Sequence, residues 1–226
     1  MTGGEPAHLL FETFAALSDV SGLRHGFTLR VPGVDVRADR GVALARLDQF
    51  HTQVREEIGA GGFPFVFGEQ IHGANVALVG AHSGHPVPSV DGVVTDAPDV
   101  CLGVYVADCC AIYLVDPVTR AIGLAHSGKK GTEGNIAQVA VRKMVDAFGC
   151  VPGRIIAQLS PCIRPPHYEI DFAAAIREQL RAAGIGKVHD TNRCTACDPG
   201  RYYSYRAERG RTGRMLALLA WPSTPK

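Results

Sequence analysis

The segment CCAIYLVDPVTRAIGLAH, residues 109–126, decides the fold of this chain. It contains two apolar runs, 111–115 and 121–125, and each has the length of a β-strand. Between them lies the sequence DPVT at 116–119. This is a turn sequence, because proline presets the backbone and the aspartate before it can bond its own chain. The segment therefore predicts an antiparallel β-hairpin.

Cys109 and His126 stand at the two open ends of this hairpin. If the strands pair around a turn at 116–119, the two residues are directly opposite, with Cβ atoms about 4.5–5.5 Å apart on one face. At that separation a thiolate and an imidazole can share one zinc ion, or the imidazole can activate the thiol as a nucleophile. The other interpretation is a small buried cysteine beside a histidine without a chemical role. A register shifted by one residue would put the side chains on opposite faces.

Strand and helix patterns surround the hairpin. Short apolar runs bounded by turn residues predict further strands at 63–67, 75–79, 100–107 and 154–159. Helical spacing of apolar residues, with capping side chains, predicts helices at 42–58, after Thr132 and after Asp171. These elements indicate an α+β fold with mixed β-sheets and outer helices, and the length of 226 residues fits a single domain over 1–226.

The overall composition is that of an ordinary globular protein. The chain has 46% hydrophobic residues and a formal net charge of +1, so neither disorder nor a nucleic-acid or anionic membrane partner is indicated. No run approaches the roughly 18–20 apolar residues that span a bilayer. Residues 1–17 are interpreted as a short amphipathic helix and not as a secretion signal. We therefore expect a cytoplasmic protein whose seven cysteines are reduced thiols.

Other residues with chemical potential lie outside the hairpin. His72 occupies a polar turn between two apolar strands, where a loop can carry a ligand. Asp108 could hydrogen-bond a ligand histidine or cap the hairpin. Cys194 and Cys197 have the spacing of half a structural zinc site, but no second pair lies at a matching distance. We interpret these two cysteines as a redox pair or as residues without function.

Several short motifs follow one another along the chain: QIHG at 70–73, DGVVTD at 91–96, ADCC at 107–110, AHSG at 125–128, SPCI at 160–163, YSYR at 203–206 and TGRM at 212–215. In this order they resemble the motifs of the family known as polyphenol oxidase (laccase domain) or peptidoglycan editing factor. The resemblance covers about residues 24–221. Two segments depart from the family pattern, because Lys129-Lys130 stands where Trp-Arg is usual and a shorter loop at 31–40 lacks the usual Asn-Leu-Gly.

The resemblance implies a metal site and an activity. It implies that His72, Cys109 and His126 bind one Zn²⁺ per chain, with these three residues at the centre of catalysis. It also implies phosphorolysis of adenosine, inosine and 5′-methylthioadenosine, and deamination of adenosine, so purine nucleosides and phosphate are the expected small-molecule partners. Copper is not expected, because the chain lacks the His-x-His pairs that multicopper oxidases use in numbers.

Candidate substrate contacts fall into three groups. Gly128, Lys129, Lys130 and Thr132 belong to a Gly-rich strand-to-helix connection whose amides favour an anion, although a solvated turn explains the pattern equally well. Arg206 follows an aromatic run whose tyrosines alternate as in a half-buried strand, which we favour over stacking on a purine. The third group, His25 and Arg30, matches a family motif that lines the pocket.

Three hypotheses of function remain open. The first is a zinc-dependent purine nucleoside phosphorylase with adenosine deaminase activity. The second is a metal-independent hydrolase with Cys109 as nucleophile and His126 as base, acting on peptidoglycan precursors. The third is a non-catalytic metal-binding or quality-control module. Polyphenol oxidase is the older family label, and nothing in the sequence specifies the oligomeric state.

Overall fold

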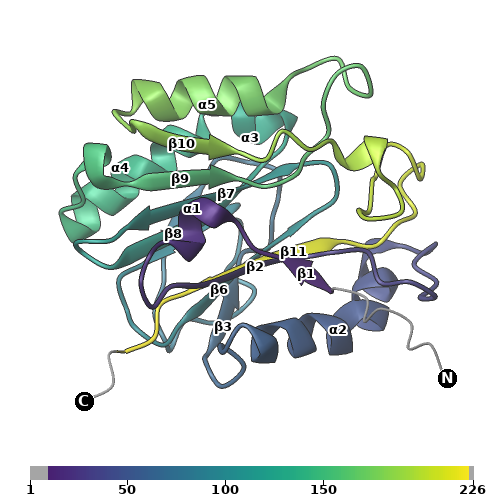
Figure 1. The fold of residues 1–226 in the computed structure, drawn as a ribbon, viewed down its shortest axis with the longest axis horizontal. Helices are drawn as coiled ribbons and strands as arrows, with labels where there is room; N and C mark the ends of the chain where they lie inside the picture. Colours follow the sequence, from purple (N-terminus) through teal and green to yellow (C-terminus); the bar gives the residue numbers. More distant parts are fainter. Residues whose placement is uncertain (1–9, 224–226) are drawn as a thin grey trace, which may run out of the picture.

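Two β-sheets lie face to face in the computed structural model, which describes residues 10–223, and helices cover the outer face of each sheet (Figure 1). The first sheet has five strands in the order β1-β2-β11-β6-β3. Their bounds are β1 Phe11–Glu12, β2 Arg24–Thr28, β3 Phe65–Phe67, β6 Cys101–Val106 and β11 Met215–Ala220. Strand β3 runs parallel to β6, whereas the other pairs are antiparallel.

The second sheet has six strands in the order β10-β9-β7-β8-β5-β4. Their bounds are β4 Val76–Leu78, β5 Gly92–Thr95, β7 Cys110–Asp116, β8 Ala121–Ser127, β9 Ile156–Leu159 and β10 Lys187–Asp190. The two outer pairs are parallel and the central pairs are antiparallel. Both sheets are therefore mixed, as predicted.

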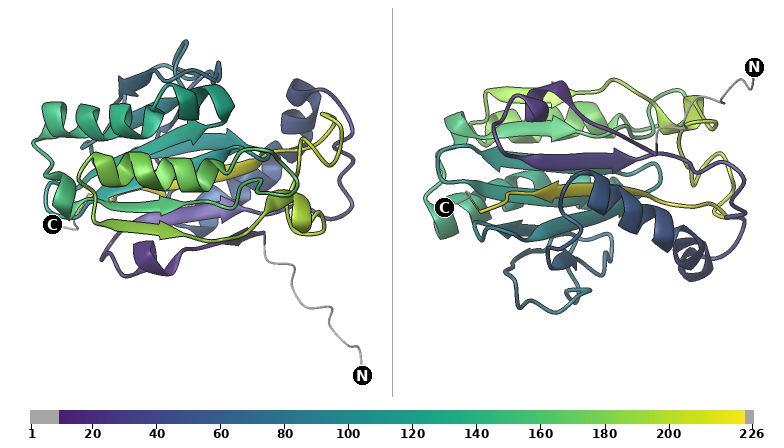
Figure 2. Two further views of the ribbon diagram at one scale, coloured as in Figure 1. Left: turned by 90° about the horizontal axis from the view of Figure 1, so that it is seen from above. Right: turned by 60° about the horizontal axis from the view of Figure 1, so that its bottom comes forward.

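Helices complete the outer layers. Their bounds are α1 Ala15–Ser18, α2 Arg40–Glu57, α3 Lys129–Glu133, α4 Ile136–Phe148 and α5 Phe172–Ala182, with 3₁₀ turns η1 at Pro152–Arg154 and η2 at Thr195–Cys197. Figure 2 shows α4 and α5 lying across the second sheet and α2 lying against the first sheet on the opposite side of the molecule. The arrangement confirms the predicted α+β fold with outer helices.

The sequence of β7 shows why the sheets occupy the middle of the molecule. Its odd residues, such as Tyr113, are buried in the apolar core between the two sheets. Its even residues, such as Ile112, are buried in a second core against α4 and α5. Because successive side chains of a strand point to opposite faces, a strand covered on both sides is a continuous apolar run. A third core lies between α2 and the outer face of the first sheet.

The predicted hairpin exists, but its predicted register is wrong. His126 pairs with Ala111 and not with Cys109, which lies just before β7. The last pair before the loop is Asp116 with Ala121. The loop therefore begins one residue later than expected, and the cross-strand partner of every residue in β7 shifts by two.

The turn explains the shift. Asp116 stays in the strand, and its carboxylate accepts a hydrogen bond from the Val118 amide over 2.9 Å. The chain then reverses through Arg120, which has a φ of 60°. A shift of two residues keeps side chains on the same face, because the side-chain period of a strand is two. Cys109 and His126 consequently remain neighbours on one face, as a diagonal pair.

Three other predictions are corrected. Within the described part of the expected helix at 1–17, strand β1 comes first and only residues 15–17, which belong to α1, are helical, while residues 1–9 lie outside the described part. Thr132 does not begin the long helix: it lies inside α3, and Asn135 precedes α4. The tyrosine run at 202–205 forms no strand. Tyr202 and Tyr203 are buried, whereas Tyr205 is exposed.

Across 10–223, none of the helices combines the length and the apolar character that a bilayer span requires.

Candidate metal centre and its pocket

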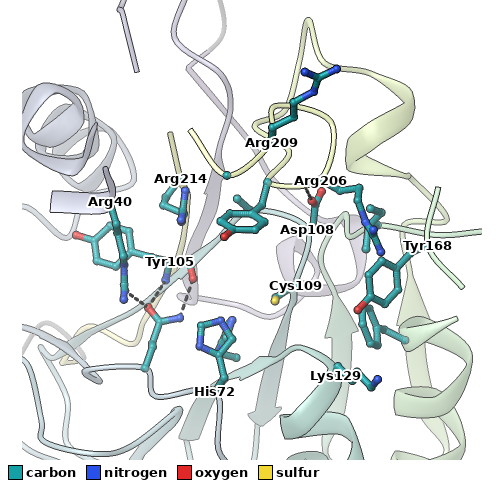
Figure 3. Close-up of a pocket in the computed structure, with 17 residues that line it drawn as sticks. Arg40, His72, Tyr105, Asp108, Cys109, Lys129, Tyr168, Arg206, Arg209 and Arg214 are labelled. Carbon is teal, nitrogen blue, oxygen red and sulfur yellow. Dashed lines mark hydrogen bonds between the residues drawn. The ribbon is translucent and has the colours of Figure 1, made fainter. Parts of the chain in front are cut away.

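His72, Cys109 and His126 come together in the structure, with one ligand atom of each lying within 4.8 Å of the others. His72 is on the loop between β3 and β4, Cys109 is between β6 and β7, and His126 is in β8. Three separate chain segments therefore meet at one point (Figure 3). The diagonal relation across the β7–β8 hairpin brings the cysteine and one histidine together. Together the three residues form a group that could hold a metal ion.

Asp91 forms hydrogen bonds that position this group. Its Oδ1 lies 2.9 Å from Nδ1 of the buried His126 and accepts the backbone N–H of His72 over 2.8 Å. Its Oδ2 accepts the N–H of Gly73 over 2.7 Å. A carboxylate on one ring nitrogen fixes the proton there, so Nε2 of His126 keeps its lone pair for a metal. One side chain thus orients both histidines.

The loop that carries His72 is held in a specific backbone conformation. Gln70 and His72 both have positive φ values, 58° and 61°. This region is unfavourable for residues other than glycine, so surrounding contacts must stabilise it. Besides Asp91, the Gln70 side chain supplies such contacts, because it donates to the carbonyl oxygen of Tyr105 and accepts from the same residue's N–H. The loop is therefore tied to strand β6.

Electrostatics favour a thiolate at Cys109. Burial alone would raise the pKa of this thiol, but His126 and His72 outweigh burial and lower it to about 6. Burial alone would likewise lower the pKa of His126, but Cys109 and Asp91 raise it to about 9. Asp91 follows the same logic, since hydrogen bonds from His126 and the loop backbone overcome its burial and lower its pKa. A deprotonated sulfur is the form that binds a metal.

A pocket of about 610 Å³ opens in front of the three residues. Its cationic lining residues are Arg40, Lys129, Arg206, Arg209 and Arg214. Its aromatic lining residues are Tyr105, Tyr168, Phe172 and Tyr205. In Figure 3, Arg40 and Arg214 lie on one side of Cys109, and Arg206 and Tyr168 lie on the other. The pocket therefore offers positive charge and an aromatic ring on each side of Cys109, with Tyr105 on the Arg40 side and Tyr168 on the Arg206 side.

Asp108 is the acidic side chain among the lining residues, and it is fully engaged. Its Oδ1 accepts from the Thr195 hydroxyl over 2.6 Å, and its Oδ2 accepts from the Arg206 backbone N–H over 2.7 Å. Asp108 thus connects the loops that carry Thr195 and Arg206 to the pocket wall beside Cys109. Neither predicted role is found, because the carboxylate bonds neither a ligand histidine nor the hairpin.

The predicted substrate contacts separate into two sets. Lys129 and Arg206 line the pocket, where Arg206 stacks over the Tyr168 ring at 4.7 Å. Lys130 is exposed and lies outside the pocket lining. The hydroxyl of buried Thr132 is used inside the fold, where it donates to the Gly128 carbonyl over 2.8 Å.

Gly128 packs closely against Cys109. A Cβ at this position would lie 2.7 Å from Sγ of Cys109. The residue is therefore small because the Cys109 sulfur occupies the space that a side chain would need.

His25 and Arg30 are also engaged elsewhere. His25 is buried, and its Nε2 accepts the Phe14 N–H over 2.9 Å. Arg30 forms an ion pair with Glu208 over 2.6 Å and stacks on Tyr203 at 4.5 Å. Neither His25 nor Arg30 lines the pocket.

Several residues of the site were not selected from the sequence. Asp91 was seen only as part of a motif, although an Asp-Gly pair at the start of a strand is a position where a carboxylate can face inward. Arg40 and Arg209 lie in polar segments far from the hairpin, and no local pattern connects them with it. Tyr205 was considered for stacking on a purine but was set aside, because the alternating tyrosines favoured a half-buried strand.

The fold and the site together define a class of protein. Its members have two packed mixed sheets and a His-Cys-His group that could hold a metal ion, and this group lies at the wall of a cationic pocket. The chain belongs to the family described as multi-copper polyphenol oxidoreductase laccase, whose sequence model matches residues 33–173 and 167–222. This match confirms the resemblance that the motifs predicted.

Related proteins agree with this assignment. The purine nucleoside phosphorylase YlmD of Geobacillus stearothermophilus is 35% identical over 191 residues, covering 67% of this chain and 70% of that protein. A purine nucleoside phosphorylase of Deinococcus radiodurans is 33% identical over 233 residues, covering 88% and 89%. The crystal structure of the Geobacillus YlmD superimposes with a TM-score of 0.78 at 27% identity, covering 95% of this chain and 99% of that one.

Proposed function

We propose that this protein is a zinc-dependent purine nucleoside phosphorylase that acts on adenosine, inosine and 5′-methylthioadenosine and also deaminates adenosine. One observation carries the proposal: the group formed by His72, Cys109 and His126 faces a pocket that is lined by both cationic and aromatic side chains. The names of the related phosphorylases support the substrate class.

The donor set fits zinc. Two imidazole nitrogens and one thiolate are typical zinc ligands, and three protein ligands leave a fourth position open, as in catalytic sites. Asp91 supplies the outer hydrogen bond that zinc-binding histidines usually have. Copper also accepts two histidines and a cysteine, but the described residues contain a single group of this kind and not the several that a multicopper centre needs. When bound, zinc would act as a Lewis acid toward the purine or the attacking oxygen.

The cationic residues suit phosphate. Phosphorolysis requires a phosphate oxygen to attack the ribose C1′ while the purine leaves, so two or more negative charges must be held beside the sugar. Arginine side chains bind phosphate with paired N–H donors. Arg206 and Arg214 are our candidates for this role, with Lys129 as a further positive charge at the rim.

The aromatic residues suit a purine. A flat heterocycle stacks favourably on a tyrosine or phenylalanine ring, which also excludes water from the reacting bond. Tyr205 is exposed and has the Arg214 guanidinium 5.8 Å from its ring centroid, while Tyr168 lies against Phe172 with ring centroids 4.9 Å apart. We propose that the base binds between these two sides of the pocket, near the metal.

The deciding experiment combines metal analysis with product analysis. Purified protein is measured for bound zinc and copper, then incubated with phosphate and each of the three nucleosides. Free base and ribose 1-phosphate report phosphorolysis, and inosine formed from adenosine reports deamination. Zinc-loaded protein that leaves all three nucleosides unchanged would disprove the proposed activity.

Matched variants connect activity with the site. Cys109→Ser and His72→Ala are expected to lose both bound zinc and turnover, because each removes one of three ligands. His82→Ala changes an exposed histidine outside the pocket and should retain both. If Cys109→Ser kept full turnover, the reaction would not depend on this group.

A second candidate function follows from the lowered pKa of Cys109. A thiolate paired with His126 is also the arrangement of a cysteine nucleophile and its base, so a metal-independent hydrolase is the alternative. Metal analysis separates the two functions, since a stoichiometric zinc ion bound through Cys109 leaves no free thiolate. Turnover that survives a strong chelator and is abolished by a thiol-alkylating reagent would favour the hydrolase.

A further inference from the structure

Cys194 and Cys197 form a close pair at the protein surface, away from the candidate metal ligands. Cys194 precedes the 3₁₀ turn η2, and the Cys197 N–H donates to the Cys194 carbonyl over 3.3 Å. A turn of this kind keeps its first and fourth Cα atoms within about 7 Å, which overlaps the 4.4–6.8 Å range that disulfides span. The Cys194 side chain, ahead of burial, raises the pKa of Cys197. The turn therefore places the two thiols within reach of a disulfide.

The pair also differs from the other cysteines in accessibility. Cys197 is exposed and Cys194 is partly exposed, whereas Cys101, Cys110, Cys150 and Cys162 are buried. Burial raises the pKa of Cys101 to about 12 and that of Cys110 well above its usual value. Buried thiols of this kind react slowly, because an oxidant in water neither reaches them nor finds a thiolate.

The turn between the two cysteines is connected to the metal-site wall. Thr195 is fully buried, and its hydroxyl donates to Oδ1 of Asp108 over 2.6 Å. Asp108 directly precedes Cys109, has a φ of 81° and also holds the Arg206 backbone. A single side chain thus joins the Cys194–Cys197 turn to the residue before the candidate ligand.

We propose that Cys194 and Cys197 are a redox-active dithiol, and that closing them into a disulfide weakens metal binding at Cys109 through Thr195 and Asp108. The oxidant is a low-molecular-weight disulfide such as glutathione disulfide. One thiol of the pair loses its proton and attacks a glutathione sulfur, which breaks the glutathione S–S bond and releases one glutathione thiolate. The second protein thiolate then attacks the mixed disulfide and releases the other. Two protein thiols are oxidised, and one disulfide is reduced to two glutathione molecules.

The effect of the disulfide on the metal site follows from the geometry of the turn. A disulfide fixes the torsions of both cysteine side chains within narrow ranges, and the turn between them must adjust to these values. Thr195 lies in that turn, so its hydrogen bond to Asp108 changes with it. Formation of the disulfide does not depend on the proposed function, whereas its effect on the metal rests on the metal site proposed above.

The sequence makes the first test simple. Trypsin cleaves after Arg193 and Arg201, so both thiols fall in one peptide, CTACDPGR, without any other cysteine. The zinc-loaded protein is incubated with glutathione disulfide, remaining thiols are alkylated, and the digest is analysed by mass spectrometry. We expect this peptide to be unalkylated and two hydrogens lighter, and to return to the dialkylated form after dithiothreitol.

Variants control this test. Cys197→Ser should stop at the mixed disulfide, because the second attack is impossible, while Cys150→Ser should behave as the wild type. A peptide 194–201 that remains dialkylated after oxidation of the wild type would overturn the proposal. So would a digest in which this pair reacts no faster than the buried cysteines.

The second test measures the metal. Oxidised and reduced proteins are stripped of zinc and titrated with Co²⁺, whose thiolate absorption reports binding through cysteine. We expect the oxidised wild type to bind Co²⁺ severalfold more weakly. Thr195→Val lacks the hydroxyl, so its affinity should no longer change on oxidation. If the oxidised and reduced wild type bound Co²⁺ with equal affinity, the proposed effect of the disulfide on the metal site would be contradicted, even if the disulfide forms.

Discussion

Oδ1 of Asp91 lies 2.9 Å from Nδ1 of His126, and the same oxygen accepts the backbone N–H of His72. One carboxylate therefore positions two of the three candidate ligands, although they come from different segments of the chain. The third ligand, Cys109, needs no such partner, because the hairpin places it on the same face as His126. The site is thus fixed by one side chain and one strand pairing.

Replacing Asp91 by asparagine should weaken metal binding. The amide has one acceptor oxygen where the carboxylate has two, so its NH2 group faces either the Gly73 N–H or the donors of His126 and His72, and the ring or the loop loses its orientation. Loss of such an outer partner typically reduces metal affinity by roughly 10–100-fold. A zinc competition titration with a chromophoric chelator measures the change. Asp96 is exposed and directly follows β5, the strand that Asp91 precedes. Asp96→Asn therefore serves as the control and should bind zinc as the wild type does.

Gly128→Ala should also impair the site without disturbing the backbone. The residue has φ −99° and ψ −164°, which alanine adopts readily, but its new Cβ would lie 2.7 Å from Sγ of Cys109. The sulfur must move away from the histidines, so we expect zinc affinity to fall while the thermal midpoint of the apo protein changes little. Gly153→Ala, where a Cβ meets nothing within 4 Å, is the matched control. Unchanged zinc affinity in Gly128→Ala would contradict the assigned sulfur position.

Much of the fold follows from the sequence because buried strands are locally distinctive. The apolar runs that predicted β6, β7 and β8 are nearly continuous, as expected for strands that are covered on both faces. The equally apolar β11 was not predicted as a strand. The short strands β2, β5 and β10 were missed, since their sequences mix polar and small residues. The hairpin register was also missed, because the loop ends at Arg120 in a left-handed conformation that no glycine or asparagine indicates.

The site was only partly predictable for a related reason. Cys109 and His126 are joined by a local hairpin, so their proximity follows from sequence spacing even when the register is shifted by two. Asp91 reaches His126 only because β5 pairs with β8, a long-range contact that no local pattern specifies. The tyrosine run at 202–205 was misinterpreted because alternation is typical of a strand, whereas here the Ser204 and Arg206 N–H groups donate to the carboxylates of Glu208 and Asp108 and hold the segment as a loop.

Arg206→Gln should affect phosphate more than the nucleoside. The substitution removes the charge but retains much of the side-chain stem, and the Arg206 backbone N–H can still bond Asp108. A hydrogen bond to a charged group contributes about 1.5–3 kcal/mol, so the KM for phosphate should rise roughly tenfold or more. Initial rates at varied phosphate measure this. Arg211→Gln, at an exposed position outside the pocket, should leave the KM unchanged. Equal KM values for both variants would remove Arg206 from the phosphate site.

Acid should destabilise the protein through two buried histidines. Burial lowers the pKa of His25 and of His51 to about 4, below the usual value of 6.5. Between about pH 4 and pH 6.5 these histidines bind protons in the unfolded chain but not in the folded protein. The free energy of unfolding that the neutral histidines contribute is therefore complete above about pH 6.5 and is lost as the pH falls toward 4. Each histidine should lower the free energy of unfolding by on the order of 1–2 kcal/mol between pH 7 and pH 5.

Urea unfolding at pH 7 and pH 5 measures this loss, and variants assign it. His51→Gln removes one titrating group, so its unfolding free energy should fall less between the two pH values than that of the wild type. The exposed His82, changed to glutamine, should leave the full loss in place. The comparison rests on the difference between two pH values within each variant, so a general destabilisation by the substitution cancels. If His51→Gln and the wild type lost equal amounts, His51 would not be the neutral, buried group whose Nε2 lies 3.2 Å from the Arg214 carbonyl.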